Sequence, residues 1–406
     1  MDASVYFAIP VLDENEYLFA TLDCIAEQSC KNNIYTYICV NQPDDWWYTD
    51  KIDICLRNQE LISSLQKNYR NLQIKLIDKS SKGRGWIGKK YGVGIARKTL
   101  INSILHHASP NDIIISMDAD THFDTSFVSH VVNDLKSNPQ AVALNLPYLH
   151  PISDNEQQDR AILRYELYLR NYMLNMLRIN SPYAFTAFGS AIACKVKDYI
   201  AVGGFDTQKS GEDFYFLQKM VKYGLIKLYS QAKVFPSPRI SERVVFGTGT
   251  AVVDFQTDNS KRYPVFHYSS FDYIQEVYEQ LGDIYKQDIQ TVFTDFLTQH
   301  LGKTDLWGKL RTNYKTLPMF KKAFHQKVNG LRLFQFLRNT QITINKTDEM
   351  CLHDYMTKFY SHVNYKLGEK SFEEMDVEIL LKLRELLATQ EDFMRKQKDL
   401  AVFGKI

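Results

Sequence analysis

The sequence has few cysteines and almost no excess of charge of either sign. Its 406 residues include 6 cysteines, 49 lysines and arginines, and 47 aspartates and glutamates. No two cysteines form a C-x-x-C pair, and no cysteine or histidine lies at the spacing of a zinc site. The formal charge of +2 gives no general attraction for polyanions, so nucleic acid is not an expected partner.

Long apolar runs are also missing. The most apolar stretch, 183–194, is short and is interrupted by Thr, Gly and Ser, so no membrane-spanning helix is expected. The first residues, Met1 to Ser4, lack the basic region of a secretory signal. We therefore expect a cytoplasmic protein whose thiols are reduced.

Strand and helix patterns alternate over the first 130 residues. Apolar strands are expected at 5–11, 34–40, 74–77 and 113–117, with helices between them at 14–28, 59–69 and 92–106. Strands separated by helices predict an α/β fold with a parallel sheet, whose ligands bind beyond the carboxyl ends of the strands. Polar or acidic residues follow three of these ends, which suits one shared cleft: Asp13 and Glu14, Asn41, and Asp118 and Asp120.

The pattern changes after residue 141. A long helix is expected over 155–178, a helix over 211–223 that Glu212 and Asp213 introduce, and a strand over 227–234. Beyond about residue 270 the patterns are helical, and the clearest covers 371–398. We expect a first domain at 1–265, with halves 1–130 and 131–265, and a helical C-terminal extension at 266–406.

Asp118 and Asp120 form a D-x-D directly after an apolar strand. Two carboxylates that leave a strand end supply hard oxygen ligands for Mg²⁺ or Mn²⁺, and such a cation can hold a diphosphate. By itself the pattern also fits an aspartate that caps the following turn. The metal site therefore depends on the other motifs of the chain.

Those motifs follow one another in a definite order. They are Ile9-Pro10-Val11-Leu12-Asp13-Glu14, Lys82-Gly83-Arg84-Gly85, Ser116-Met117-Asp118-Ala119-Asp120, Val202-Gly203-Gly204-Phe205-Asp206 and Ser210-Gly211-Glu212-Asp213-Phe214. With this order and spacing, residues 4–250 resemble the glycosyltransferases of the GT-A fold, above all family 2. The resemblance implies a Rossmann-like mixed sheet with helices on both faces, here followed by a helical C-terminal region.

The resemblance also implies roles for single residues. Donor-binding residues would be Pro10, Asp13, Glu14, Asn41, Lys82, Arg84, Asp118, Arg239 and Arg243, and the ligands of Mn²⁺ or Mg²⁺ would be Asp118, Asp120 and His267. Two positions depart from the family pattern, because Asp13 replaces the usual Asn and Asn41 stands where an acidic residue is frequent. His267 lies between aromatic residues, so a packed, hydrogen-bonded histidine is the alternative to a metal ligand.

The activity that the resemblance implies is metal-dependent transfer of a sugar from a nucleotide-diphosphosugar donor, UDP- or GDP-linked, to a hydroxyl of a glycan, polysaccharide or lipid-linked acceptor. The leaving diphosphate needs a cation and basic groups, and the acceptor hydroxyl needs a base. Asp213 is the implied base of an inverting hexosyltransferase, and Glu212 the implied acceptor ligand.

Two other functions stay open. A nucleotidyltransferase of similar fold would want a glycine-rich basic loop after the first strand, where this chain has Asp13-Glu14-Asn15-Glu16. A non-catalytic binding or scaffold protein is the second alternative, although the chain retains both the D-x-D and the E-D.

The C-terminal part contains a basic segment at 303–338. It has nine basic residues and one acid, Asp305, interleaved with six aromatic residues. Such a segment could lie on the inner face of a membrane near a lipid-linked acceptor. We favour the alternative, a solvated helix face that packs its aromatic side chains inward. The rest of the helical tail is expected to shape the acceptor side or an oligomer interface.

Overall fold

The computed structural model describes residues 3–69, 72–88, 91–153, 155–239, 263–361 and 370–404. By its contacts the chain divides into two compact units. Unit 1 comprises Met1–Asp154, Phe185–Thr250 and Arg395–Ile406, and unit 2 comprises Asn155–Ala184 and Ala251–Met394. Arg243, predicted on the donor side, lies outside the described residues.

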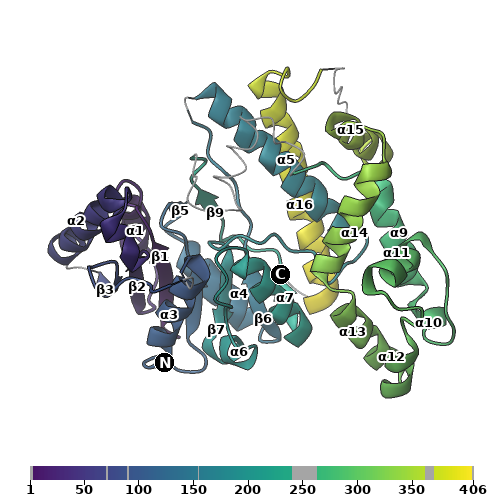
Figure 1. Cartoon of the computed structure of the whole chain (residues 1–406), viewed down its shortest axis with the longest axis horizontal. Helices are drawn as coiled ribbons and strands as arrows, with labels where there is room; N and C mark the ends of the chain where they lie inside the picture. Colours follow the sequence, from purple (N-terminus) through teal and green to yellow (C-terminus); the bar gives the residue numbers. More distant parts are fainter. Residues whose placement is uncertain are drawn as a thin grey trace. The chain divides into compact units, whose positions relative to one another are not determined.

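Unit 1, whose strands β1, β2, β3, β6 and β7 are labelled in Figure 1, is built on a seven-stranded sheet. Its strand order is β3-β2-β1-β4-β7-β6-β8. Its strands are β1 (Val5–Val11), β2 (Ile34–Asn41), β3 (Gln73–Lys79), β4 (Ile113–Ser116), β6 (Ala141–Asn145), β7 (Ile192–Lys195) and β8 (Leu225–Lys227). β1 pairs in parallel with β2 and β4, whereas β7 runs antiparallel to β4 and β6. The predicted α/β class, with a mixed sheet, is confirmed.

Helices cover both faces of this sheet. All of β4 and nearly all of β1 is buried, and successive side chains of a strand point to opposite faces. α3 lies against β1 and β2, and α4 lies against β6 and β7. The helices of unit 1 are α1 (Leu18–Ala26), η1 (Asp44–Tyr48), α2 (Ile52–Asn68), α3 (Val93–Leu105), α4 (Phe127–Ser137), α6 (Val196–Ala201) and α7 (Glu212–Tyr223).

The strand predicted over 227–234 is wrong. β8 ends at Lys227, and the next strand, β9 (Val234–Pro236), pairs antiparallel with β5 (Thr121–Phe123) in a separate two-stranded sheet. The ladder stops because the Asp399 carboxylate accepts the backbone N–H of Leu228 and of Tyr229, at 2.9 and 2.7 Å. A side chain from the end of the sequence thus takes the hydrogen bonds that a neighbouring strand would need.

The described part of unit 2 is helical. Its helices are α5 (Glu156–Arg178), α9 (Tyr268–Glu279), α10 (Leu281–Ile284), α11 (Val292–Leu301), α12 (Gly308–Asn313), α13 (Leu317–Lys327), α14 (Gly330–Thr343), α15 (Asp348–Phe359) and most of α16 (Val377–Phe403), whose last turns belong to unit 1. The helical C-terminal region is therefore confirmed. By contacts α5 belongs with these helices, although its sequence position falls within the predicted first domain. The boundary at residue 265 stays a prediction.

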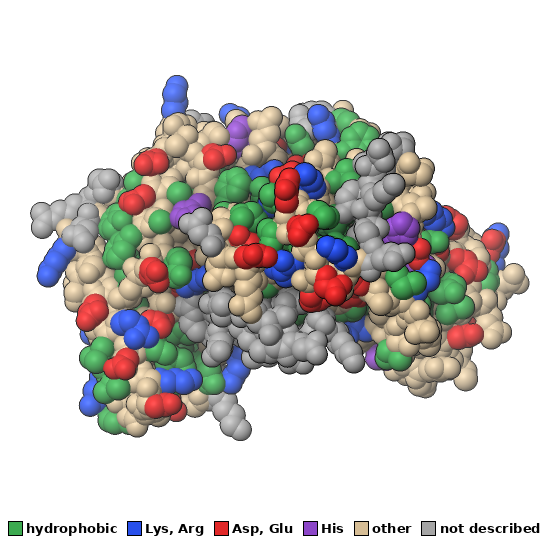
Figure 2. Space-filling view, turned by 90° about the horizontal axis from the view of Figure 1, so that it is seen from above, with side chains coloured by type: hydrophobic (Ala, Val, Ile, Leu, Met, Phe, Trp, Pro, Cys, Tyr) green, Lys and Arg blue, Asp and Glu red, His purple; other side chains and the backbone are tan. Residues whose placement is uncertain are grey.

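The basic segment 303–338 packs its aromatic side chains inward. Trp307, Phe320, Phe324 and Phe336 are buried, whereas most of the lysines between them are exposed. Acidic and basic side chains are interspersed on the face drawn in Figure 2, as the near balance of charge predicts. Within the described ranges, no helix is both long and apolar enough to cross a membrane.

Candidate active site

Acidic side chains gather where β1 and β4 end. The two strands are parallel neighbours, so the segments after their carboxyl ends leave the same edge of the sheet. Arg239, which follows β9, joins the two segments. Its Nη2 donates to both carboxylate oxygens of Glu14 at 2.7 Å, and its Nε donates to Oδ2 of Asp120 at 2.8 Å. The structure therefore brings together three residues that the sequence predicts for the donor and metal site.

A second arginine, Arg97 of α3, holds three further groups. Its guanidinium donates to Oγ of Ser116 at 2.6 Å, to Oε1 of Glu212 at 2.9 Å and to Oδ1 of Asp118. The Arg97 side chain is 2% exposed, so these bonds replace the water that a buried cation loses. Arg97 therefore links the end of β4 to the first turn of α7.

The backbone of Gly189 closes over this arginine. A Cβ on Gly189 would lie 2.8 Å from Cζ of Arg97 and 3.2 Å from Oδ1 of Asp118. Side chains of other residues do not fit at such distances, and the Arg97 guanidinium is held by three partners and cannot easily move aside. Position 189 thus requires glycine, because there is no space for a side chain.

Asp213 follows Glu212 in the first turn of α7. Gly211 starts this helix with φ of +74°, a conformation that favours glycine. Oδ1 of Asp213 accepts the backbone N–H of Phe214 at 2.7 Å. Burial, followed by repulsion from the Glu212 carboxylate, raises the pKa of Asp213 to about 8, against the opposing charge of Arg97. Burial also raises the pKa of Glu212, and Arg97 again opposes the shift.

The raised pKa of Asp213 predicts how stability depends on pH. In the unfolded chain the carboxyl loses its proton near pH 4, but in the folded protein it keeps the proton until about pH 8. The folded state is therefore favoured below pH 4, and this contribution is lost as the pH rises to 8. Asp213→Asn, which resembles the protonated form, should match the wild-type melting temperature just below pH 4 and exceed it increasingly as the pH rises to about 8. A difference that does not change with pH would contradict the raised pKa.

The remaining predicted donor residues have local partners. Asp13, with φ of +58°, forms an ion pair of 2.6 Å with Arg57. Asn41 donates to the backbone carbonyl of Val11 at 2.8 Å and accepts from Nε1 of Trp86 at 3.0 Å. It thereby fastens the ends of β1 and β2 to the loop after β3.

Pro10, Lys82 and Arg84 lie on or after strand ends of the same sheet. Pro10 is the penultimate residue of β1. The ammonium of Lys82 lies 4.8 Å from the centre of the Tyr48 ring, and Arg84 is exposed with Nη1 3.3 Å from Oδ2 of Asp78. The contacts of Lys82 and Arg84 belong to the surface around the end of β3. Roles for all three in donor binding stay predictions.

His267 is part of unit 2, where it caps α9. Its Nδ1 lies 2.6 Å from Oγ of Ser269, and its Nε2 lies 3.2 Å from Oδ2 of Asp354. Burial lowers the pKa of His267, so the neutral ring is favoured. Both ring nitrogens thus have partners within unit 2, and the metal-ligand role stays a prediction. Among the described residues, no group of three or more His, Cys, Asp and Glu side chains lies ready for a metal ion.

Arg97 is not among the residues predicted from the sequence, although it connects three of the groups at the site. Its signal is the one basic side chain on the apolar face of α3, between Ala96 and Leu100, which are both fully buried. A charged residue at such a position requires a buried counter-charge.

Comparison with known proteins gives distant likenesses. No family model matches the chain, and no curated protein matches it in sequence. Similar solved structures include S. aureus TarS 1-349 in complex with UDP-GlcNAc, at 12% identity, 99% of this chain, 92% of that chain and a TM-score of 0.40. Another is the mannosyltransferase PcManGT from Pyrobaculum calidifontis in complex with GDP-Man and Mn²⁺, at 12% identity, 97% and 88% coverage and a TM-score of 0.43. These TM-scores are below 0.5, so the function proposed next rests on residues of this chain.

Proposed function

We propose that unit 1 is a glycosyltransferase that uses a nucleotide-diphosphosugar donor. The observation that carries the proposal is the cluster at the ends of β1 and β4, where five carboxylates surround two arginines. Glu14 and Asp120 bind Arg239, while Asp118 and Glu212 bind Arg97 with Asp213 beside them. Strand ends of an α/β sheet are where ligands bind, and fixed charges there can meet a diphosphate.

The cluster fits a divalent cation in its chemistry. With Asp213 protonated, four carboxylates still face two guanidinium groups and leave an excess of negative charge, and carboxylate oxygens are the ligands that Mg²⁺ and Mn²⁺ prefer. We propose that Asp118 and Asp120 hold this cation. When bound, it would neutralise charge that develops on the leaving diphosphate. Arg239 already neutralises part of the Asp120 and Glu14 charge, so it would contribute to the same task.

Asp213 is the proposed general base. A base works best when its pKa lies near the working pH, and burial beside a second carboxylate brings the pKa of Asp213 into that range. Glu212 is 3% exposed and bound to Arg97, which supports a role in holding Arg97 in place. Contact of Glu212 with the acceptor, and an inverting outcome, remain parts of the proposal that rest on the family resemblance.

The finer assignments are also proposals. They are a UDP- or GDP-linked hexose, family 2, a role in polysaccharide synthesis, a glycan or lipid-linked acceptor, and a cytoplasmic location with contact of 303–338 at the membrane surface. A nucleotidyltransferase is disfavoured, because the segment after β1 is acidic and Asp13 is bound to Arg57.

A nucleotide screen tests the proposal. We expect one nucleotide diphosphate among UDP, GDP, CDP and dTDP to raise the melting temperature by roughly 5 °C at a concentration 100-fold above Kd, and only with Mn²⁺ or Mg²⁺ present. Asp120→Asn should lose the metal-dependent shift. Asp124→Asn, which removes the same charge from an exposed position just after β5, should keep it.

Two results would contradict the proposal. One is the absence of a shift with all four nucleotides in a protein that is folded. The other is a metal-dependent shift that Asp120→Asn retains in full, which would remove the metal assignment while leaving nucleotide binding.

A further inference from the structure

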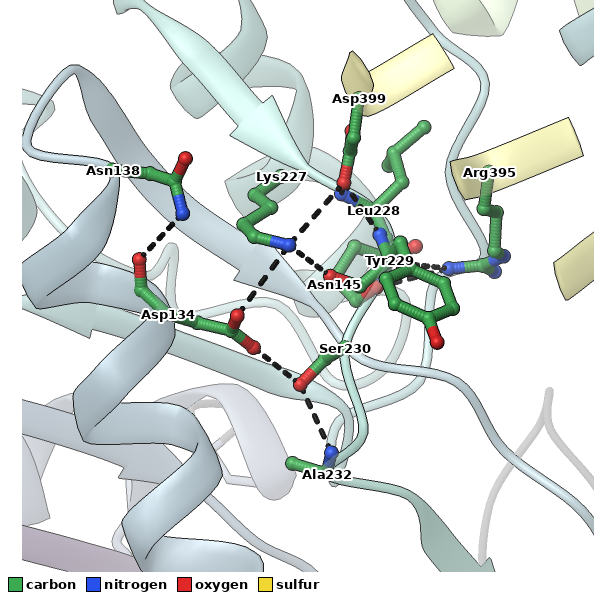
Figure 3. A network of polar contacts seen from close by, with 10 residues as sticks. All are labelled: Asp134, Asn138, Asn145, Lys227, Leu228, Tyr229, Ser230, Ala232, Arg395 and Asp399. Carbon is green, nitrogen blue, oxygen red and sulfur yellow. Dashed lines mark hydrogen bonds and ion pairs between the residues drawn. The ribbon is translucent and has the colours of Figure 1, made fainter. Parts of the chain in front are cut away.

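The last turns of α16 enter unit 1 through a buried arginine. Arg395 is fully buried, and its Nη1 donates to the backbone carbonyls of Asn145 at 2.9 Å and Leu228 at 3.0 Å (Figure 3). Its Nη2 lies 3.5 Å from Oγ1 of Thr186. Burying a guanidinium costs free energy unless its N–H groups form hydrogen bonds. The two carbonyls therefore determine the position of Arg395, and Arg395 in turn holds the two carbonyls in place.

Asn145, at the end of β6, connects the Arg395 contact to the segment that contains Thr186. Its Nδ2 donates to the backbone carbonyl of Thr186 at 2.7 Å, and its Oδ1 accepts the backbone N–H of Thr186 at 3.0 Å. The side chain therefore pairs with Thr186 as a neighbouring strand would. Arg395 contacts both members of the pair, through the carbonyl of Asn145 and the hydroxyl of Thr186.

The segment held in this way ends at the candidate site. Three residues after Thr186, Gly189 closes over Arg97 and Asp118 with no room for a side chain. Since the fit of Gly189 against the ion pair tolerates little displacement, the position of 186–190 controls whether Arg97 can hold Asp118 and Glu212.

We propose that Arg395 is a positioning residue for the site: through Asn145 and Thr186 it fixes segment 186–190 against the Arg97–Asp118 pair. The consequence for turnover rests on the glycosyltransferase proposal, whereas the effect on segment 186–190 does not. No contact between Arg395 and a substrate is implied.

A neighbouring residue of α16 supplies a matched control. Asp399, one turn after Arg395, is also buried and accepts the backbone N–H groups of Leu228 and Tyr229, with Nζ of Lys227 at 3.7 Å. These contacts anchor the same helix end, but they lie on the β8 side (Figure 3), and their partners are Leu228, Tyr229 and Lys227 rather than Asn145 or Thr186. Loss of Asp399 therefore reports on docking of the helix alone.

The experiment compares Arg395→Met, Arg395→Lys and Asp399→Asn. Hydrogen–deuterium exchange should accelerate at least tenfold in peptides covering 185–191 for Arg395→Met. Asp399→Asn, with a similar fall in melting temperature, should stay within threefold of wild type there. Arg395→Lys, which keeps a donor for the carbonyls, should recover part of the protection. In the transfer reaction Arg395→Met should lower kcat at least tenfold with a smaller change in donor KM, and Asp399→Asn should not.

The outcomes separate the two proposals. Unchanged exchange at 185–191 in Arg395→Met, or equal acceleration in Asp399→Asn, would overturn the positioning role. A wild-type protein without nucleotide binding or transfer would overturn the proposed function, while the exchange data would still decide the structural step. If Arg395→Met does not fold, Thr186→Val decides instead: it removes the hydroxyl contact alone and should accelerate exchange at 185–191 by about threefold.

Discussion

Replacing Asp213 with asparagine is expected to lower kcat about 10³-fold and to leave the affinity for the nucleotide diphosphate within threefold of wild type. Asparagine keeps the shape of the side chain and can still accept the N–H of Phe214, but it cannot take a proton from an acceptor hydroxyl. Initial rates at saturating donor and acceptor measure kcat, and calorimetric titration measures the affinity.

The pH dependence of kcat/KM and a control variant test the same role of Asp213. With a base whose pKa is about 8 in the unliganded protein, wild-type kcat/KM should increase with pH up to about 8 and level off above it. Asp206→Asn, which removes an exposed carboxylate paired with Lys219 at 2.7 Å, should keep both the rate and the profile. An Asp213→Asn variant within threefold of wild-type kcat would exclude Asp213 as the base.

The raised pKa of Asp213 should also lower the stability of the folded protein at high pH, and this effect tests whether Asp213 is the base. A group that would keep its proton until pH 8, but must lose it to act, is less favourable in its working form than in its resting form. If Asp213→Asn is both inactive and more stable at pH 9, one residue accounts for both effects. Greater stability with unchanged activity would make the raised pKa a property of packing alone.

The positions of the acidic residues could be predicted from the sequence because they follow apolar strands. The apolar run 113–117 predicts a buried strand, and the parallel pairing of β1 with β4 then places Glu14 and Asp120 at one edge of the sheet. Partner choice could not be predicted in this way. Asp13 and Glu14 are adjacent in the sequence, yet Asp13 turns to Arg57 with a positive φ whereas Glu14 turns to Arg239.

The docking of α16 was beyond prediction for a related reason. Arg395 and Asp399 lie four residues apart in a helix rich in charged residues, so their pattern indicates a solvated face. In the structure both are buried, because backbone groups of Asn145 at the end of β6 and of Leu228 just after β8 take the place of water. The pattern of apolar residues locates a helix, but it cannot distinguish a charge bonded to buried carbonyls from one in solvent. The prediction of a strand over 227–234 was wrong for the same reason: the Asp399 carboxylate binds the N–H groups of Leu228 and Tyr229, and this contact is not visible in the sequence.

Arg97→Met should destabilise the protein by about 3–5 kcal/mol, because it leaves the carboxylates of Asp118 and Glu212 near each other without their shared cation. The shift of the urea unfolding midpoint, multiplied by the slope of the transition, measures this effect. Arg57→Met also breaks an arginine–aspartate ion pair, one held by two hydrogen bonds of 2.6 and 2.8 Å, but the Arg57 side chain is 45% exposed, so its cost should stay below about 1 kcal/mol.

Combining Arg97→Met with Glu212→Gln shows whether the loss of stability comes from uncompensated charge or from lost packing. If uncompensated charge causes the loss, Arg97→Met with Glu212→Gln should be more stable than Arg97→Met alone by at least about 1 kcal/mol. Mn²⁺ should also raise the melting temperature of Arg97→Met more than that of wild type, since the cation replaces the missing positive charge. If the second substitution and the cation restore nothing, Arg97 acts by filling space. The excess of negative charge from which we infer the cation site would then not be supported.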